Sequence, residues 1–193
     1  MNDKIKNIKT EILSDNWYVL KKITYDYKQR DGTWTTISRE AYDRGNGAAI
    51  LLYNKEQGTV ILTRQFRLPS YINGNSSGML IEACAGLLDM DNAEDCIKRE
   101  TEEEMGYKVS SVQKIFEAYM SPGSVTEMLT FFVAEYEKNM KVTEGGGLQD
   151  DHEDIEVVEI SLADALGMIE NGIIKDAKTI ILLYYTCIHK LIE

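Results

Sequence analysis

Residues 86–107 constrain the fold and chemistry of this 193-residue chain more than any other segment. Asn92 can cap a helix, two acidic residues follow in its first turn, and Gly106 can end it. Neither proline nor glycine interrupts the residues between them. The sequence therefore predicts a loop, a helix and a second loop.

Three glutamates share one side of this predicted helix. Glu100, Glu103 and Glu104 occupy positions i, i+3 and i+4, so their carboxylates project close together. Carboxylates this close repel one another unless a cation lies between them. Oxygen ligands of this kind suit Mg²⁺ or Mn²⁺ better than Zn²⁺. A solvated acidic helix face shows the same spacing, so the spacing alone leaves both interpretations open.

The residues around these glutamates resemble the Nudix box, whose pattern is Gly-x5-Glu-x7-Arg-Glu-U-x-Glu-Glu-x-Gly-U, where U is apolar. Arg99 and Gly106 match this pattern together with the three glutamates. The chain departs from it in three ways: the first loop is one residue shorter, Asp91 replaces a glutamate, and Thr101 replaces an apolar residue. The departures spare the carboxylates that bind metal in the family. The resemblance implies a hydrolase that uses Mg²⁺, with Mn²⁺ as a substitute.

Bulk composition limits the partners. The net charge of −11 argues against non-specific nucleic-acid binding, which needs a basic surface. The composition, 44% hydrophobic and 27% charged, is ordinary for a soluble protein, and no apolar run reaches the length of a membrane span. The three cysteines show no Cys-x-x-Cys spacing. We therefore expect a cytoplasmic protein without nucleic-acid or membrane partners.

Hydrophobic periodicity predicts an α+β chain with the Nudix fold, a mixed β-sheet between helices, preceded by an antiparallel hairpin. The first 13 residues form a weakly amphipathic lead-in, and residues 68–77 form a loop. Asp31-Gly32 is typical of a tight hairpin turn. The predicted strands cover residues 17–29, 34–42, 48–53, 59–66, 79–83, 112–119, 127–136 and 155–160, and the later helices cover 161–171 and 176–191.

Two regions follow from this pattern. Residues 1–44 would form an N-terminal sheet extension, and residues 45–193 would form the Nudix domain, with the box at 86–107. In Nudix pyrophosphatases that act on nucleoside diphosphate sugars, a similar N-terminal sheet is exchanged between two subunits. The resemblance therefore implies a homodimer, and an edge hairpin on a monomer is the alternative.

The resemblance also implies a metal site and a base. In the family, the carbonyl of the residue before the box glycine binds metal, which corresponds to Ala85, beside Glu100, Glu103 and Glu104. Related enzymes place a water-activating glutamate just before a late strand, which corresponds to Glu153, also a candidate metal ligand. Asp151 and Asp154 are the alternatives for the base. A triple glycine at residues 145–147 precedes these acids and is interpreted as a hinge, with a disordered acidic loop as the other interpretation.

Further residues are candidates for substrate binding. Arg67 stands in a Gln-x-Arg context that the family often uses to hold a phosphate, and its guanidinium suits phosphate oxygens. Lys178 begins the last predicted helix, where an anion is favoured. Pro122 lies 16 residues after Gly106, which resembles the ADP-ribose and nucleotide-sugar pyrophosphatases. The remaining candidates are Arg39, Glu40, Ala85, Gly86, Leu87 and Glu127.

The likeness extends beyond the box. Residues 16–53, including 42–47, and residues 84–89, 120–123 and 145–147 resemble the bacterial GDP-mannose pyrophosphatase (NudK) subfamily. This implies hydrolysis of GDP-mannose, a nucleotide sugar, to GMP and mannose 1-phosphate. Two alternatives stay open: an ADP-ribose pyrophosphatase that forms AMP and ribose 5-phosphate, and a non-catalytic nucleotide-binding module. The expected signature of such a module is loss of box carboxylates, and here all three are present.

Overall fold

The computed structural model describes residues 3–88, 92–148 and 153–192. The chain forms two compact units. The first consists of Met1–Asn46 and Tyr119–Met128, and the second of Gly47–Ala118 and Leu129–Glu193. The predicted domain boundary between residues 44 and 45 stays a prediction. Nothing in the sequence assigns residues 119–128 to the first unit.

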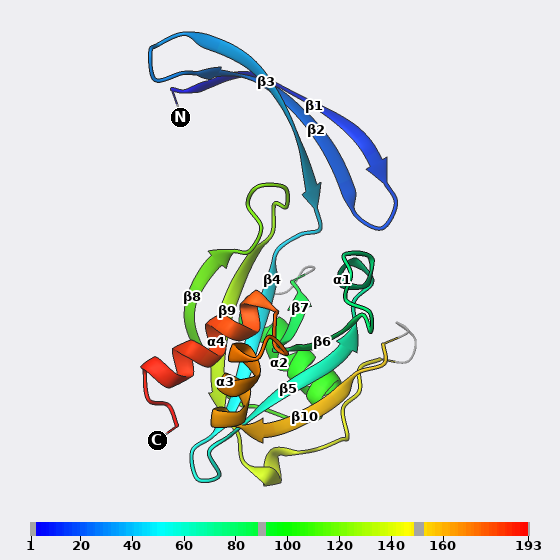
Figure 1. Cartoon of the computed structure of the whole chain (residues 1–193), viewed down its shortest axis with the longest axis vertical. Coiled ribbons are helices and arrows are strands. Elements are labelled where there is room, and N and C mark those ends of the chain that lie inside the picture. Colours follow the sequence, from blue (N-terminus) through cyan, green and yellow to red (C-terminus); the bar gives the residue numbers. More distant parts are fainter. Residues whose placement is uncertain (1–2, 89–91, 149–152, 193) are drawn as a thin grey trace. The chain divides into compact units, whose positions relative to one another are not determined.

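The first unit is built on a three-stranded antiparallel sheet in the order β1-β2-β3 (Figure 1). Its strands are β1 (Ile5–Asp15), β2 (Val19–Lys28) and β3 (Trp34–Asp43). The turn between β2 and β3 contains the expected Asp31-Gly32 pair. Asp31 Oδ1 accepts hydrogen bonds from the Thr33 amide and hydroxyl at 2.9 and 2.7 Å, and Gly32 has a φ of 90°.

The N-terminal lead-in differs from the expectation, because it forms the 11-residue strand β1. Nearly all of its side chains are exposed, so the strand lacks the apolar alternation that a half-buried strand shows. Its register against β2 also shifts twice, and Asn7 adopts a positive φ of 54° beside the first shift. An exposed, irregular edge strand of this kind leaves little periodic signal in the sequence.

The segment 119–128 is bound to the end of β3 within the first unit. The Tyr42 amide donates to the Ser124 carbonyl at 2.8 Å, and the Thr126 amide donates to the Tyr42 carbonyl at 3.1 Å. Arg44 forms an ion pair with Glu127 at 3.3 Å. Pro122 therefore lies in a segment that backbone bonds attach to the N-terminal sheet.

The second unit contains a seven-stranded mixed sheet in the order β10-β5-β4-β9-β8, with β6 paired to β5 and β7 paired to β4. The pair β4–β9 is parallel, and β5 pairs antiparallel with β4, β6 and β10. One side of β4 pairs first with β7 and then with β5. The strands are β4 (Gly47–Asn54), β5 (Thr59–Phe66), β6 (Met79–Glu82), β7 (Cys84–Leu87), β8 (Gln113–Tyr119), β9 (Met128–Glu135) and β10 (Glu156–Ser161).

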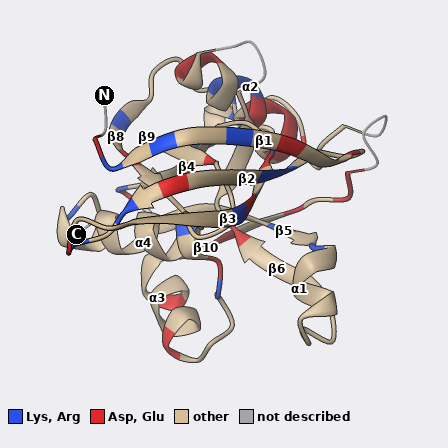
Figure 2. Cartoon of the chain, turned by 90° about the horizontal axis from the view of Figure 1, so that it is seen from above, with Lys and Arg blue, Asp and Glu red and all other residues tan. Residues whose placement is uncertain are grey.

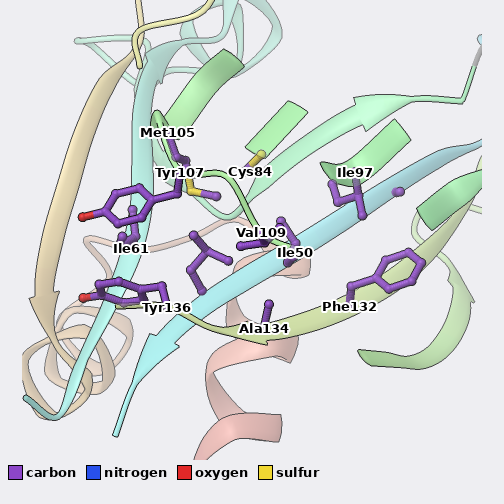
Figure 3. Close-up of a cluster of buried hydrophobic side chains, with 12 residues drawn as sticks. Ile50, Ile61, Cys84, Ile97, Met105, Tyr107, Val109, Phe132, Ala134 and Tyr136 are labelled. Carbon is purple, nitrogen blue, oxygen red and sulfur yellow. The ribbon is translucent and has the colours of Figure 1, made fainter. Parts of the chain in front are cut away.

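The core lies on both faces of β4, whose eight residues are all buried. Alternate residues of this strand, including Ile50, pack in one cluster with Ile97 and Met105 of helix α2 (Ala93–Met105) (Figure 3). Helix α4 (Ala177–Ile188) also contacts β4. This arrangement is the expected α+β fold, with a mixed sheet between helices, and an uninterrupted apolar run is typical of a strand covered on both faces.

Local signals explain the remaining helices. Ser161 caps α3 (Leu162–Glu170) by accepting from the Asp164 amide at 3.0 Å, and Asp176 caps α4 through the Thr179 amide at 3.0 Å. Part of the expected loop 68–77 forms the short helix α1 (Leu68–Ile72), with Pro69 in its first turn, where a missing N–H does no harm. A 3₁₀ turn, η1, covers Lys138–Met140. Among the described residues, no helix is both long and apolar enough to cross a membrane.

Candidate functional site

Helix α2 carries the predicted carboxylates, and local residues fix both its ends. The Asn92 side chain accepts from the amides of Glu94 and Asp95 at 3.1 and 3.0 Å. At the other end Gly106 adopts the left-handed conformation, with a φ of 78°. Figure 2 shows the acidic residues of this helix in red. The capping that the sequence predicted is confirmed on both sides.

Thr101, which departs from the box pattern, is fully buried in this helix. Its hydroxyl donates to the Ile97 carbonyl at 2.6 Å, so the polar group is satisfied within the helix. The packing beneath the helix therefore tolerates the substitution. Asp91, the other departure, lies outside the described residues.

Strand β7 brings Ala85 and Gly86 beside the carboxylate helix. Gly86 pairs with Ala48 of β4, and a Cβ at Gly86 would overlap the Glu100 carboxyl group. Glycine at this position leaves that space to the Glu100 side chain. The Glu100 side chain is held in turn by Arg99, whose Nη1 donates to Glu100 at 3.0 Å and to Glu103 at 3.3 Å.

Glu104 is the most deeply buried of the three carboxylates, with 3% of its surface exposed. Its Oε2 atom has no hydrogen-bond partner among the described residues. Burial raises the pKa of Glu104 to about 8, and the nearby charges of Glu100 and Glu153 act in the same direction against the opposing influence of Cys84 and Arg67. A buried carboxyl oxygen without a donor indicates a missing cationic partner.

The residues present fit a divalent cation in their chemistry. The Glu104 oxygen lacks a partner, Glu100 lies in a space kept open by Gly86, and the donors are all oxygens of the kind that Mg²⁺ binds. Burial also raises the pKa of Glu100, although Arg99 opposes the rise. Within the described residues, no three acidic, histidine or cysteine side chains already surround one ion position. Arg99 pairs with Glu100 and Glu103, so a bound cation would compete with Arg99 for these two carboxylates.

A buried carboxyl group with a raised pKa makes metal-free stability depend on pH. Because the pKa of Glu104 is about 8 in the folded protein, against 4.5 ordinarily, its stabilising contribution is complete below pH 4.5 and is lost as pH rises through 8. Glu104→Gln removes this loss. We expect metal-free E104Q to melt about 5 °C or more above the metal-free wild type near pH 9, since each pKa unit is worth about 1.4 kcal/mol.

Thermal melts followed by circular dichroism in EDTA measure this difference. At about pH 4, below the ordinary pKa of glutamate, the two proteins should melt at similar temperatures. Equal melting temperatures at about pH 9 would contradict the account, because they would mean that Glu104 is not buried as a charged group there.

The glycine segment 145–147 is bound to the end of α2. The Gly146 amide donates to the Glu104 carbonyl at 2.9 Å, and the Gly147 amide donates to the Glu103 carbonyl at 3.1 Å. All three glycines have positive φ, and a Cβ at Gly145 would overlap the backbone at the end of α2. The glycines therefore permit close backbone contact here, which differs from the hinge suggested by the sequence.

Glu153 follows this segment and is held against it. Its Oε2 accepts from the Leu148 amide at 3.0 Å, and its side chain lies against Gly147. Its charge raises the pKa of both Glu100 and Glu104. The structure thus brings Glu153 to the carboxylate helix, while the alternative base Asp151 lies outside the described residues. A cavity of about 540 Å³ adjoins the helix, lined by Arg99, Glu102, Glu103, Thr143, Gly145, Gly147 and Leu148.

Arg67 and Lys178 meet at an acid that sequence reasoning missed. Arg67 Nε and Nη2 donate to the two oxygens of Glu82 at 3.0 Å each, and Lys178 Nζ donates to Glu82 Oε2 at 2.7 Å. The two cations lie far apart in the sequence, so their contact depends on tertiary structure. A lone acid ending the apolar run 79–82 was the available signal, since buried acids are seldom unpaired.

The other candidate substrate contacts are divided between the two units. Arg39, Glu40 and Glu127 belong to the first unit, where the first two line a cavity of about 610 Å³ together with Pro122. Leu87 is in β7 of the second unit, and its carbonyl accepts from the Cys96 thiol at 3.1 Å. Their substrate roles, like that of Gly86, stay predictions.

Two family models together match most of the chain. A family model described as NUDIX domain matches residues 43–182, and one described as GDP-mannose pyrophosphatase NudK N-terminal domain matches residues 4–42. A GDP-mannose pyrophosphatase of Yersinia pestis (strain Pestoides F) is 59% identical over 189 residues, covering 98% of this chain and 94% of the relative. One of Yersinia enterocolitica is 57% identical over the whole of both chains.

A GDP-mannose pyrophosphatase of Citrobacter koseri is 55% identical and covers 96% of each chain. Among solved structures, one described as an ADP compounds hydrolase superposes with a TM-score of 0.67. It covers 93% of this chain and 89% of its own, at 20% sequence identity. At that identity the likeness concerns the fold alone.

Proposed function

The chain belongs to the Nudix family, and from that premise we propose that it hydrolyses the diphosphate bond of GDP-mannose to GMP and mannose 1-phosphate. The observation that carries the proposal is Glu104, a buried carboxylate with an unpartnered oxygen on the box helix. Such a group favours a bound cation, and a cation is what an anionic diphosphate needs in an acidic protein. The non-catalytic module is less favoured, because all three box carboxylates are present.

The residues that would hold Mg²⁺, or Mn²⁺ in its place, are the Ala85 carbonyl, Glu100 and Glu104, with Glu103 and Glu153 assisting. When bound, the cation would neutralise the diphosphate and act as a Lewis acid on the breaking bond. The fit rests on the open space at Gly86 and on the oxygen donors. Because Arg99 pairs with Glu100 and Glu103, it would have to yield at least one of them.

Glu153 is the proposed general base. It would take a proton from a water molecule whose oxygen forms a new bond to one phosphorus, while the bond from that phosphorus to the bridging oxygen breaks. The bond electrons leave with the second phosphate. Arg67 and Lys178 would hold phosphate oxygens during this step, since hydrogen bonds to Glu82 fix the two cations together.

GDP-mannose is favoured over ADP-ribose because relatives carrying the GDP-mannose pyrophosphatase name are 55–59% identical over nearly the whole chain. The ADP compounds hydrolase supports only the shared fold.

We also propose a homodimer in the cytoplasm. Support for the dimer comes from residues 3–46, which hold nine Lys and Arg against seven Asp and Glu although the chain carries −11. Exposed Ile8, Ile12 and Trp17 also lie on this region.

A substrate comparison tests the function. Purified protein is incubated with GDP-mannose, ADP-ribose and other nucleotide sugars, and kcat/KM is measured for each. We expect GDP-mannose to exceed ADP-ribose at least tenfold, a difference of about 1.4 kcal/mol in transition-state binding. A preference for ADP-ribose would overturn the substrate but keep the reaction. Inactivity towards every diphosphate compound would overturn the enzyme assignment.

A further inference from the structure

Glu82, the last residue of β6, is a charged side chain in an almost fully buried place. Only 2% of its side chain is exposed, and both of its carboxyl oxygens accept hydrogen bonds. The guanidinium of Arg67 binds it through two parallel bonds of 3.0 Å, and Lys178 adds a third bond at 2.7 Å. Paired bonds of this kind fix an arginine in orientation as well as in position.

The two cations keep Glu82 ionised. Burial by itself raises the pKa of Glu82, but the hydrogen bond from Arg67 and the charge of Lys178 outweigh it and hold the pKa below its ordinary value. Lys178 has a second carboxylate partner, Asp176, at 3.1 Å. The two acids and two bases therefore balance in charge, which lets them lie together in a poorly solvated place.

The backbone around Glu82 is equally constrained. Thr63 of β5 pairs with Glu82 in the sheet, and its hydroxyl donates to the Glu82 carbonyl at 3.2 Å. The following amide, that of Ala83, donates to the Thr179 hydroxyl at 2.6 Å. Thr179 lies in the first turn of α4, next to Lys178. Glu82 thus connects β5, β6 and α4 at one fixed point.

The Glu82 site adjoins the carboxylate cluster. Part of the Arg67 guanidinium there stays available to bind another group. Glu82 uses the Nε–Nη2 edge of the guanidinium, so the Nη1 edge can bind another group, and 41% of the Arg67 side chain is exposed. Arg67 also interacts electrostatically with Glu104, because its positive charge opposes the rise in the pKa of that carboxyl group. The candidate ligand Ala85 comes only three residues after Glu82.

We propose that Glu82 is a positioning residue, which holds Arg67 and Lys178 together so that both cations meet the substrate diphosphate beside the carboxylate cluster. The proposal rests on the proposed function. Glu82 itself touches neither substrate nor metal and acts through the two cations. Misplacing a phosphate-binding group by about 1 Å can cost a hundredfold in rate. Removing Glu82 should therefore lower turnover without removing either cation.

A double-mutant cycle tests whether Glu82 acts through Arg67. We expect Glu82→Gln and Arg67→Gln each to lower kcat for GDP-mannose by about ten- to a hundredfold. The double variant should lose at least about tenfold less than the product of the single losses, because both changes interrupt one interaction. Losses that multiply would overturn the proposal. Glu135→Gln is the control, since Glu135 pairs with Lys55 at the surface and should keep wild-type turnover.

A second variant and a binding measurement keep the test decisive. Glu82→Asp keeps the charge but withdraws the carboxylate by one methylene; full activity in E82D would contradict a geometric role. Calorimetric titration with methylenediphosphonate and Mg²⁺ needs no turnover. We expect Glu82→Gln to weaken methylenediphosphonate binding about tenfold when it is the only substitution. In a chain that already carries Arg67→Gln, the same change should weaken binding by clearly less. Failure of the wild-type protein to bind methylenediphosphonate would also overturn the proposal. If the protein cleaved no nucleotide sugar but the binding losses of E82Q and R67Q were still coupled, only the proposed function would be rejected.

Discussion

Glu104→Gln is expected to lower kcat for GDP-mannose by about a thousandfold or more. The substitution keeps the size of the side chain but replaces a buried anionic oxygen with a neutral amide. A carboxylate that binds a divalent cation contributes several kcal/mol of charge stabilisation at the reacting phosphorus. Steady-state kinetics at saturating Mg²⁺ and GDP-mannose measure the loss.

The matched control is Glu94→Gln on the same helix. Glu94 pairs with Lys98 at 2.6 Å, and 53% of its side chain is exposed, so its charge has no part in the proposed site. We expect E94Q to retain wild-type turnover. Near-normal turnover in E104Q, with circular dichroism showing an intact fold, would contradict a metal-binding role for the box helix.

Glu153→Gln is expected to lower kcat by a factor of about 10² to 10⁴, the usual contribution of a general base. The glutamine can still accept the Leu148 amide bond that Glu153 Oε2 makes at 3.0 Å, so the local backbone should be preserved. KM should change little, because the loss occurs in the transition state.

Two neighbouring substitutions decide between the candidate bases. Asp151→Asn and Asp154→Asn should each leave kcat within about threefold of the wild type, because neither aspartate is the proposed base. If D151N or D154N lost activity by orders of magnitude while E153Q did not, the base would be the aspartate and the assignment of Glu153 would be wrong.

Local signals explain why the carboxylate helix could be predicted from the sequence. Capping depends on residues within one turn of the helix end, and Asn92 and Gly106 both act in that way. The i, i+3, i+4 spacing then fixes which glutamates share a face. The same reasoning gave the start of α3, where Ser161 caps the first turn. The last helix begins after Asp176 as expected but ends at Ile188, three residues before the predicted end at Leu191.

Features that depend on distant contacts could not be found in this way. The pairing of Glu82 with Lys178 joins residues 96 positions apart, and no spacing rule connects them. The sequence of residues 145–147 suggests a hinge. It gives no sign that their amides bond to the end of α2, because those bonds are tertiary contacts. The strand β1 was missed for another reason: its exposed side chains give neither face an apolar pattern.

The most direct test of the account is phosphorus NMR of GDP-mannose incubated with the wild-type protein, with Mg²⁺ and then with EDTA. The account predicts that the diphosphate resonances disappear only with Mg²⁺ and that equal amounts of GMP and mannose 1-phosphate replace them. Unchanged GDP-mannose in the presence of Mg²⁺, or equal cleavage in EDTA, would contradict a cation-dependent diphosphate hydrolase built on the carboxylates of α2.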